Sequence, residues 1–284
     1  MKIAIASGKG GTGKSTVAAN LAYTIARSRD VVLVDCDVEE PNLHLSFPAP
    51  AVDVPVTTPV PVIDPARCTL CGECGKFCRF GALAVVKDCV LTFPHLCHSC
   101  GGCAKLCPQK AIQDVPRNIG SIKRGASGSV TILSGIMNTG VASGVPIIQR
   151  LLQIVKEEEG LVVLDCPPGS ACTVMESIRD ADYCLLVAEP TLFGMHNLEC
   201  VCNLVKEFRK PFGVVLNKCT EEENPSETFC RRNNYPILAS IPFDYEVGRL
   251  NSDGEIAVRR LPTFEKLFRE LLDTITSEVK RLCA

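Results

Sequence analysis

Residues 7–16 read SGKGGTGKST, and the expectations for the rest of the chain start from this stretch. It fits the pattern G-x-x-x-x-G-K-[ST], with Gly8, Gly13, Lys14 and Ser15 at the fixed positions. The apolar run KIAIAS precedes it, and TVAANLAYTIARS follows with apolar residues at helical spacing. These flanks predict a strand, a phosphate-binding loop and a helix in succession. A turn that is only rich in glycine would not need such flanks, so they favour the phosphate-binding loop.

In such a loop, backbone N–H groups close around phosphate and the helix N-terminus adds positive potential. Lys14 is expected to reach the outer phosphates, and the Ser15 hydroxyl is expected to ligate Mg²⁺. The residues predicted to contact ATP or ADP here are Gly8, Lys9, Gly10, Gly11, Thr12, Gly13, Lys14, Ser15 and Thr16.

Lys9 is not part of the minimal pattern. With this early lysine, KGGTGKST resembles the deviant Walker A motif of the MinD/ParA superfamily of ATPases, which includes the nitrogenase iron protein and the Mrp-type iron-sulfur carriers. The resemblance implies that Lys9 crosses a dimer interface to the nucleotide of the partner subunit. It therefore implies a homodimer that forms when ATP is bound.

Two further apolar runs end in carboxylates. VVLVDCD ends in Asp35 and Asp37, and in LVVLDCPPG the apolar residues LVVL are followed by Asp165. Buried parallel strands deliver such residues to one shared edge of a sheet, where they can hold Mg²⁺ through water and orient an attacking water molecule. By resemblance to the family, Asp37 is the water-activating aspartate, and Asp165 is the aspartate on the magnesium side, before a switch segment at 167–169.

The segments GVVLNKC and ASIPFD resemble the adenine-binding pieces of the same family, which nominates Asn217, Pro242 and Asp244. The matching pieces occur in the order of the family and span residues 1–45 and 120–284. We therefore expect an α/β fold with a doubly wound, mostly parallel sheet and flanking helices.

The composition changes between these two halves. SFPAPAVDVPVTTPVPVIDP, residues 46–65, carries six prolines, which favour an extended, semi-rigid strap over a helix. Pro116 marks the expected return to the main fold, before the apolar run SVTILSG. We expect a discontinuous ATPase domain, residues 1–60 and 116–284, and an inserted domain, residues 61–115.

The insert contains a repeat of cysteines. CTLCGECGKFC and CHSCGGCAKLC share the spacing C-x2-C-x2-C-x3-C, and their first cysteines are 29 positions apart. Cysteines at this spacing wrap a 4Fe-4S cubane, and the fourth of each run reaches the other cluster. The expected ligand sets are Cys68, Cys71, Cys74 and Cys107 for one cluster, and Cys97, Cys100, Cys103 and Cys78 for the other.

Both runs resemble bacterial two-cluster ferredoxins, which implies a small α+β domain. Pro108 follows Cys107 as in that pattern, whereas Arg79 follows Cys78 where proline is usual, so the local turn there departs from the pattern. Zinc also accepts four thiolates, but its sites are typically built from separated C-x2-C pairs. Cys89 and His98 are assigned no ligand role.

The composition narrows the class of protein. The chain has 30 Lys and Arg against 32 Asp and Glu, so no basic excess indicates nucleic acid. No signal-peptide core or membrane-span-length apolar run is present, which favours a cytoplasmic protein without membrane contact.

In a chain of 284 residues, 18 cysteines then favour metal ligands over disulfides, and those in apolar runs are expected to be buried hydrophobes. Cys200 and Cys202, two apart on an expected helix, should face apart.

The C-terminal segment LPTFEKLFRELLDTITSEVKRLCA predicts an amphipathic helix. Its charges nearly balance, whereas a membrane-targeting helix usually has a basic polar face. We expect its apolar face to dock onto the sheet. The residues predicted on that face are Leu261, Phe264, Leu267, Phe268, Leu271, Leu272 and Ile275.

Three functions fit these motifs. The first is an ATP-switched dimer that couples hydrolysis to electron transfer through two fully ligated clusters, toward a redox or metal-cluster partner protein. The second is a cluster scaffold or carrier of Mrp type, and the third is a positioning ATPase of MinD type without redox work. Saturated, retentive cluster sites favour the first.

Overall fold

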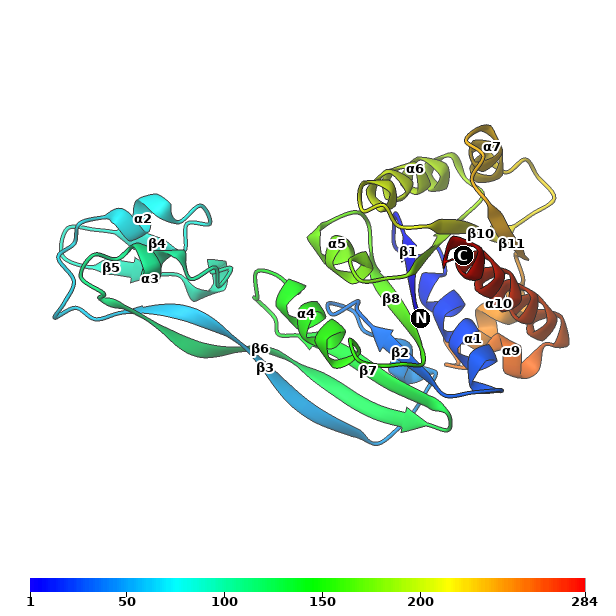
Figure 1. The fold of residues 1–284 in the computed structure, drawn as a ribbon, viewed down its shortest axis with the longest axis horizontal. Coiled ribbons are helices and arrows are strands. Elements are labelled where there is room, and N and C mark those ends of the chain that lie inside the picture. Colours follow the sequence, from blue (N-terminus) through cyan, green and yellow to red (C-terminus); the bar gives the residue numbers. More distant parts are fainter. Residues whose placement is uncertain (284) are drawn as a thin grey trace.

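A nine-stranded sheet forms the centre of the protein in the computed structural model, which describes residues 1–283 (Figure 1). The strand order is β11-β10-β9-β1-β8-β2-β7-β6-β3. The strands from β11 to β7 are parallel, and β6 and β3 are antiparallel to their neighbours. The nine strands are β1 (Lys2–Ser7), β2 (Val31–Asp35), β3 (Ala51–Ile63), β6 (Ile112–Ser127), β7 (Val130–Met137), β8 (Leu161–Pro168), β9 (Tyr183–Ala188), β10 (Phe212–Cys219) and β11 (Ile237–Pro242).

Helices cover both faces of the sheet, so the predicted doubly wound α/β fold is confirmed. One apolar core lies under α4 (Val145–Ile154), α5 (Cys172–Ile178), α6 (Leu192–Glu207) and α7 (Pro225–Arg232). The other lies under α1 (Lys14–Ala26), α8 (Tyr245–Ser252), α9 (Ala257–Arg260) and α10 (Pro262–Cys283). A short 3-10 turn, η1 (Leu43–Leu45), follows β2 on the second face.

The C-terminal helix α10 packs onto the sheet, as its amphipathic pattern predicts. Phe268, Leu271 and Ile275 are buried in the same core as α1. Leu261 and Leu267 are partly buried against that core. Among the described helices, none combines the length and apolar character that crossing a membrane requires.

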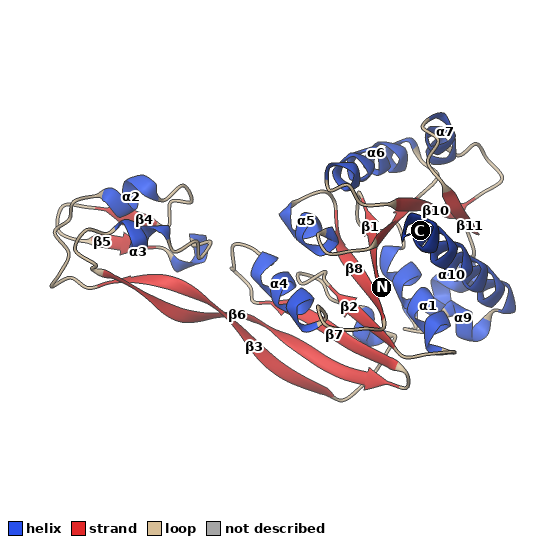
Figure 2. Ribbon diagram, viewed as in Figure 1, coloured by secondary structure: helices blue, strands red, loops and turns tan. Residues whose placement is uncertain are grey.

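The proline-rich segment was expected to be a strap, but most of it is a strand of the main sheet. Residues 51–63 are β3, the edge strand, which pairs with β6 from Ala51↔Gly125 to Ile63↔Ile112. The extended conformation was therefore predicted correctly, and the strand pairing was missed. β6 leaves β7 after the pair Gly120↔Met137, so residues 57–63 and 112–118 continue as a two-stranded ribbon (Figure 2).

The ribbon carries a separate group of elements, residues 64–111, which we call the cysteine lobe (Figure 1). The expected domain boundaries, 60/61 and 115/116, both fall within the ribbon strands. The lobe contains α2 (Glu73–Phe77), the antiparallel pair β4 (Leu83–Val85) and β5 (Val90–Thr92), the 3-10 turn η2 (Pro94–Leu96) and α3 (Gly102–Leu106).

The backbone of the cysteine lobe repeats with the same period as its cysteines. Helices α2 and α3 begin 29 residues apart. Residues with positive φ recur at the same offset, in the pairs Leu70 and Ser99, Gly72 and Gly101, and Gly81 and Lys110. The sequence repeat is thus a structural repeat of loop, helix and turn.

The scattered cysteines are mostly buried hydrophobes, as predicted for those in apolar runs. Cys36, Cys166 and Cys184 are fully buried in the core under α4 to α7. On α6, Cys202 is fully buried and Cys200 is exposed, so the two side chains face apart as expected.

Candidate functional site

The loop between β1 and α1 has the geometry of a phosphate-binding loop. Helix α1 begins at Lys14, directly after Gly13, whose φ is 90°. A Cβ atom at Gly13 would also lie 2.1 Å from the Asn217 side-chain nitrogen, so only glycine fits here. The loop borders a cavity of about 400 Å³, a size within the usual range for small-molecule sites.

The Lys14 side chain is buried at the base of this cavity and is paired with a carboxylate. Its Nζ lies 2.8 Å from Asp165 Oδ1, and the side chains are 6% and 0% exposed. Burial lowers the pKa of Lys14, but the attraction and hydrogen bond of Asp165 together with the charge of Asp37 raise it on balance, so the ammonium stays charged. The other carboxylate oxygen, Asp165 Oδ2, is buried without a hydrogen-bond partner. A buried carboxylate oxygen without a donor requires a cation or a water molecule as its partner.

Asp35 is the neighbour of Asp165 across the β2–β8 register, and it organises the loop after β2. Its carboxylate accepts backbone N–H bonds from Asp37 at 3.2 Å, Asn42 at 3.0 Å and Leu43 at 3.1 Å. Burial and the nearby Asp165 carboxylate raise the pKa of Asp35 to about 7. Asp35 therefore has a structural role, as the anchor of residues 36–43, which we call the nucleotide loop.

Asp37 lies in the nucleotide loop and lines the cavity. Burial raises the pKa of its carboxyl to about 6, against the opposing attraction of Lys14. The carboxyl group of Asp37 is thus largely ionised at neutral pH, and its pKa is close enough to neutral pH for it to exchange a proton.

Lys9 is paired within its own chain in this structure. Its ammonium is paired with the Glu189 carboxylate and lies 5.2 Å from the centre of the Phe193 ring. Thr191 Oγ1 bonds Glu189 Oε1 at 3.3 Å and also caps α6. Phe193 and its neighbour Leu192 are 65% and 72% exposed, so an apolar surface adjoins Lys9 at the rim of the cavity.

The cavity brings most of the predicted nucleotide residues together. Of these, its lining includes Lys9, Gly10, Gly11, Thr12, Gly13, Lys14, Ser15, Thr16, Asp37, Asn217, Pro242 and Asp244. Gly8 is outside the lining and packs against Asn197 of α6, and Asp165 lies beneath Lys14. Asn217 donates to Thr12 O at 2.7 Å, so it holds the loop, and Asp244 caps α8 through Glu246 N.

Several residues of the site were missed by the sequence reasoning. Glu189, Lys218, Phe243 and Asn251 contact the loop or line the cavity. For Glu189 a signal was present, because it follows the buried run YCLLVA at the carboxyl end of β9. The same rule that singled out Asp165 would have found it.

The eight repeated cysteines line two small cavities in the cysteine lobe. The lining of one includes Cys68, Cys71, Cys74 and Cys107, and the lining of the other includes Cys78, Cys97, Cys100 and Cys103. Cys78 and Cys107 thus each lie with the three leading cysteines of the other run. The sorting is the one expected from the spacing.

Backbone N–H groups point at several of these sulfurs. Ala82 N donates to Cys78 Sγ and Ala111 N to Cys107 Sγ, both at 3.3 Å and again 29 residues apart. All eight cysteines are free thiols. Within the described residues, no group of three or more His, Cys, Asp or Glu side chains converges closely enough to hold one metal ion.

The chain matches the family model described as the CobQ/CobB/MinD/ParA nucleotide binding domain over residues 3–258. The protein belongs to this family. As a MinD/ParA-type member, it is an ATP-binding P-loop ATPase, which agrees with the loop, the cavity and the paired aspartates described above.

Three relatives of this MinD/ParA-type chain are informative. It is 32% identical to an uncharacterized protein, MJ0578, of Methanocaldococcus jannaschii, with 88% of this chain and 87% of the relative covered. It is 23% identical to the chlorophyllide reductase 35.5 kDa chain of Rhodobacter capsulatus, over 94% and 71%. It is 25% identical to the cytosolic Fe-S cluster assembly factor Nubp2 homolog of Anopheles gambiae, over 97% and 96%.

Solved structures of MinD proteins share the fold. The septum site-determining protein MinD of Pyrococcus horikoshii, complexed with Mg-ADP, superposes with a TM-score of 0.62 at 21% identity. The match covers 96% of this chain and 95% of that protein. At this identity the likeness supports the fold alone.

Proposed function

We propose that this MinD/ParA-type ATPase couples its nucleotide state to electron transfer through two 4Fe-4S clusters in the cysteine lobe, toward the metal centre of a partner protein. The single observation that carries this proposal is the sorting of eight free cysteines into two cavities of four on a lobe joined to the ATPase. The chlorophyllide reductase chain among the relatives adds support, since its name associates it with a reductase.

The cysteine lobe needs a cross-link of some kind. Its buried apolar cluster is small, because Leu83 packs only among cysteine side chains and against Ile112, the first residue of β6. Segments this small rarely fold on their apolar core alone and are usually held by disulfides or metals. Its repeated cysteines form no disulfide in the part of the chain that is described, and metal–thiolate bonds would hold the lobe in their place.

The chemistry of the donor set favours iron-sulfur over zinc. A tetrahedral zinc ion gathers four sulfurs around one centre, whereas a cubane takes one thiolate on each of its irons. Both cysteine runs have the spacing C-x2-C-x2-C-x3-C, which is the spacing that wraps a cubane. The N–H groups of Ala82 and Ala111 stabilise negative sulfur at Cys78 and Cys107. When bound, such clusters supply one-electron chemistry, in which an electron from a low-potential donor protein is passed to the partner's metal centre.

We assign the residues of the nucleotide site as follows. Lys14 moves from Asp165 to the outer phosphates when ATP binds, and Ser15 and the released Asp165 carboxylate would then hold Mg²⁺, directly or through water. Asp37 orients the attacking water, and ATP and water become ADP and phosphate. The position of Lys14, Ser15 and Asp37 in the cavity lining, with Asp165 bonded to Lys14 beneath it, supports the assignment.

The ATP-bound form is proposed to be a homodimer in which Lys9 reaches the partner's nucleotide. The exposed pair Leu192 and Phe193 beside Lys9 supports an interface at this rim. The Glu189 carboxylate competes for Lys9 within its own subunit. Lys9 must break this ion pair before it can act across an interface.

Substitutions of this ion pair should act in opposite directions. Lys9→Ala should abolish ATP-dependent dimerisation and slow hydrolysis, because the charge that crosses the interface is lost. Glu189→Gln should lower the ATP concentration that gives half dimerisation by up to about fivefold, the equivalent of a partly exposed ion pair of roughly 1 kcal/mol. Analytical ultracentrifugation across an ATP titration measures both.

Glu199→Gln, at an exposed position of α6, is the matched control and should leave dimerisation unchanged. If Lys9→Ala dimerises and hydrolyses ATP like the parent, the cross-interface role of Lys9 is wrong.

The proposed function is tested by electron paramagnetic resonance of anaerobically purified, reduced protein with and without ATP and Mg²⁺. We expect the reduced-cluster signal, or its rate of re-oxidation by an acceptor, to depend on nucleotide. Asp37→Asn should still bind ATP but deliver electrons for one round only, because hydrolysis is slowed. If that variant delivers electrons steadily at the parent rate while consuming no ATP, electron transfer is not coupled to ATP hydrolysis.

A second candidate function is cluster assembly, which the Nubp2-type relative favours. The two differ in the fate of iron. A retentive electron carrier keeps its iron when challenged with a chelator during ATP turnover, whereas a cluster donor loses iron and activates an apo-acceptor. Iron retained per chain after turnover separates the two.

A further inference from the structure

The β3–β6 ribbon contains a β-bulge at the point where it leaves the sheet. Val56 pairs with Gly120, but Thr57 pairs with Asn118, so Ile119 is one extra residue on β6. Gly120 is also the last β6 residue paired with β7, so only two strands continue beyond this point. A bulge interrupts the ladder and bends the strand locally. The ribbon is therefore most easily bent here.

The bulge is anchored to the ATPase core on its inner side. Ile119 is 4% exposed and belongs to the core under α4 to α7. A Cβ atom at Gly120 would lie 2.1 Å from Ile136 O, so the strands approach too closely for any side chain. The bulge thus cannot move independently of the end of β7.

Asn138, the first residue after β7, clamps the bulge with two hydrogen bonds. Its backbone N–H donates to Ile119 O at 2.9 Å, and its side-chain Nδ2 donates to Asn118 Oδ1 at 3.1 Å. The same Asn118 oxygen accepts from Gly120 N at 2.9 Å and so holds the bulge in shape. These bonds hold residues 118–120 against the residue that follows β7.

The other side of the clamp is joined to the nucleotide loop. Met137 N, one residue before Asn138, donates to Val38 O at 2.8 Å. Val38 follows the cavity-lining Asp37 and is 1% exposed, packed against Gly135 and Gly144. A shift of the nucleotide loop must therefore displace Met137 or break this bond, and Asn138 follows Met137 directly.

We propose that the bulge at 118–120, clamped by Asn138, is the joint through which the nucleotide loop sets the position of the cysteine lobe. The linkage begins at Asp37 and Val38 in the nucleotide loop, continues through Met137 and Asn138, and ends at the bulge, residues 118–120. The hydrogen bonds given above connect these three segments. The purpose of the movement rests on the proposed function, because a redox lobe must approach and leave its partner. The mechanical linkage is independent of what the lobe binds.

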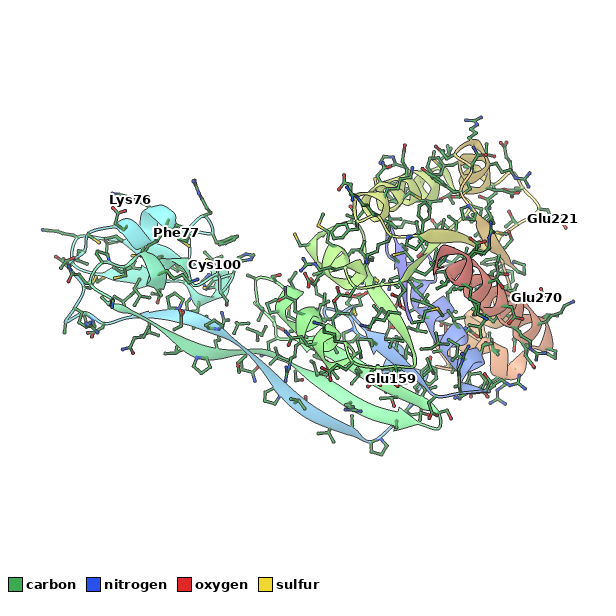
Figure 3. All side chains as sticks on the ribbon, in the orientation of Figure 1. Lys76, Phe77, Cys100, Glu159, Glu221 and Glu270 are labelled. Atoms are coloured by element: carbon green, nitrogen blue, oxygen red, sulfur yellow. The ribbon has the colours of Figure 1, made fainter. Side chains whose placement is uncertain are left out.

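The lobe lies at the far end of the ribbon from β1 and α1, so the joint would turn a small shift into a large one (Figure 1). Cys100 and Phe77, on the lobe, stand at the opposite end of the molecule from Glu270 on α10 (Figure 3). A rotation at the base of a long ribbon displaces its tip in proportion to the ribbon's length.

Hydrogen–deuterium exchange of the full holoprotein tests the joint, with ATP and ADP compared in the Asp37→Asn background. We expect nucleotide-dependent exchange both in residues 36–43 and in residues 112–120. Asn138→Ala removes one clamp bond and Asn138→Pro removes both donors. The difference at 112–120 should fall in that order, by about fivefold or more for the second, the lower end of ordinary coupling between sites. The difference at 36–43 should remain.

Asn233→Ala is the matched control, since it removes an exposed asparagine side chain that bonds Phe229 O on α7. Asn138 is exposed, so Asn138→Ala should fold even if the proline variant does not. A ribbon that responds to nucleotide equally in the parent and in Asn138→Ala, or that never responds, would overturn the joint. Absence of nucleotide-dependent electron delivery in the parent, with the ribbon still responding, would instead overturn the proposed function alone.

Discussion

Lys14→Ala should eliminate ATP hydrolysis, with a loss of at least about 100-fold, since it removes the positive charge placed for the outer phosphates. It should also destabilise the fold. Asp165 is 0% exposed and would be left as an uncompensated buried charge, which costs about 3–5 kcal/mol of unfolding free energy. Calorimetry of nucleotide binding and chemical denaturation measure the two effects separately.

A second substitution separates loss of function from loss of stability. Lys14→Ala combined with Asp165→Asn removes both charges, so most of the lost stability should return while ATP hydrolysis does not. Lys218→Ala is the control lysine, because its Nζ donates to Gly11 O at 2.6 Å on the exposed rim of the same loop. If the double variant remains as unstable as Lys14→Ala, the buried ion pair is not the cause.

Single cysteine substitutions should remove whole clusters. The anaerobically purified parent should hold about eight iron and eight acid-labile sulfide per chain, and Cys107→Ala about half of each, since each 4Fe-4S cubane needs its four thiolates. Cys89→Ala should retain the parent values, because Cys89 is exposed and lies outside both cavities. Iron and sulfide analysis and the reduced-state resonance spectrum measure the outcome.

Pairs of substitutions test which cysteines share a cluster. Cys107 and Cys71 line one cavity although they belong to different runs of the sequence, so the double variant should lose no more iron than either single variant. Cys107 and Cys100 belong to the same run but line different cavities, so their double variant should lose nearly all iron. The opposite pattern, or zinc without sulfide, contradicts the two-cluster assignment.

The parts of the fold that the sequence predicted correctly are governed by local pattern. The strand, loop and helix around Gly13 follow from residues within one short stretch, and α10 follows from helical spacing. Asp35 and Asp165 each end a buried apolar run, so their meeting at one sheet edge followed from the rule for parallel strands. The nucleotide cavity was therefore largely predictable.

What the sequence reasoning missed depends on partners far away in the chain. The prolines of β3 obscured its strand character, because proline is excluded from central strands and allowed at an edge, and β3 becomes an edge only through its pairing with β6. The hydrogen bonds of Asn138 to residues 118 and 119 likewise depend on the bulge, which no local sequence pattern predicts. The pairing of Lys9 with Glu189 requires β9 to lie next to β1.

The prolines of β3 have a consequence for the protein at high concentration. An open strand edge with exposed valines, such as Val52 and Val54, is a template on which a strand of another molecule can add. Pro55, Pro59 and Pro61 have no N–H to offer, so an incoming strand would find gaps in its ladder of donors. Pro116 interrupts the opposite edge where the ribbon runs free, beside Pro59. We therefore expect the β3 edge to resist edge-to-edge polymerisation, and replacement of these prolines by threonine to promote fibrous aggregates without affecting ATP hydrolysis.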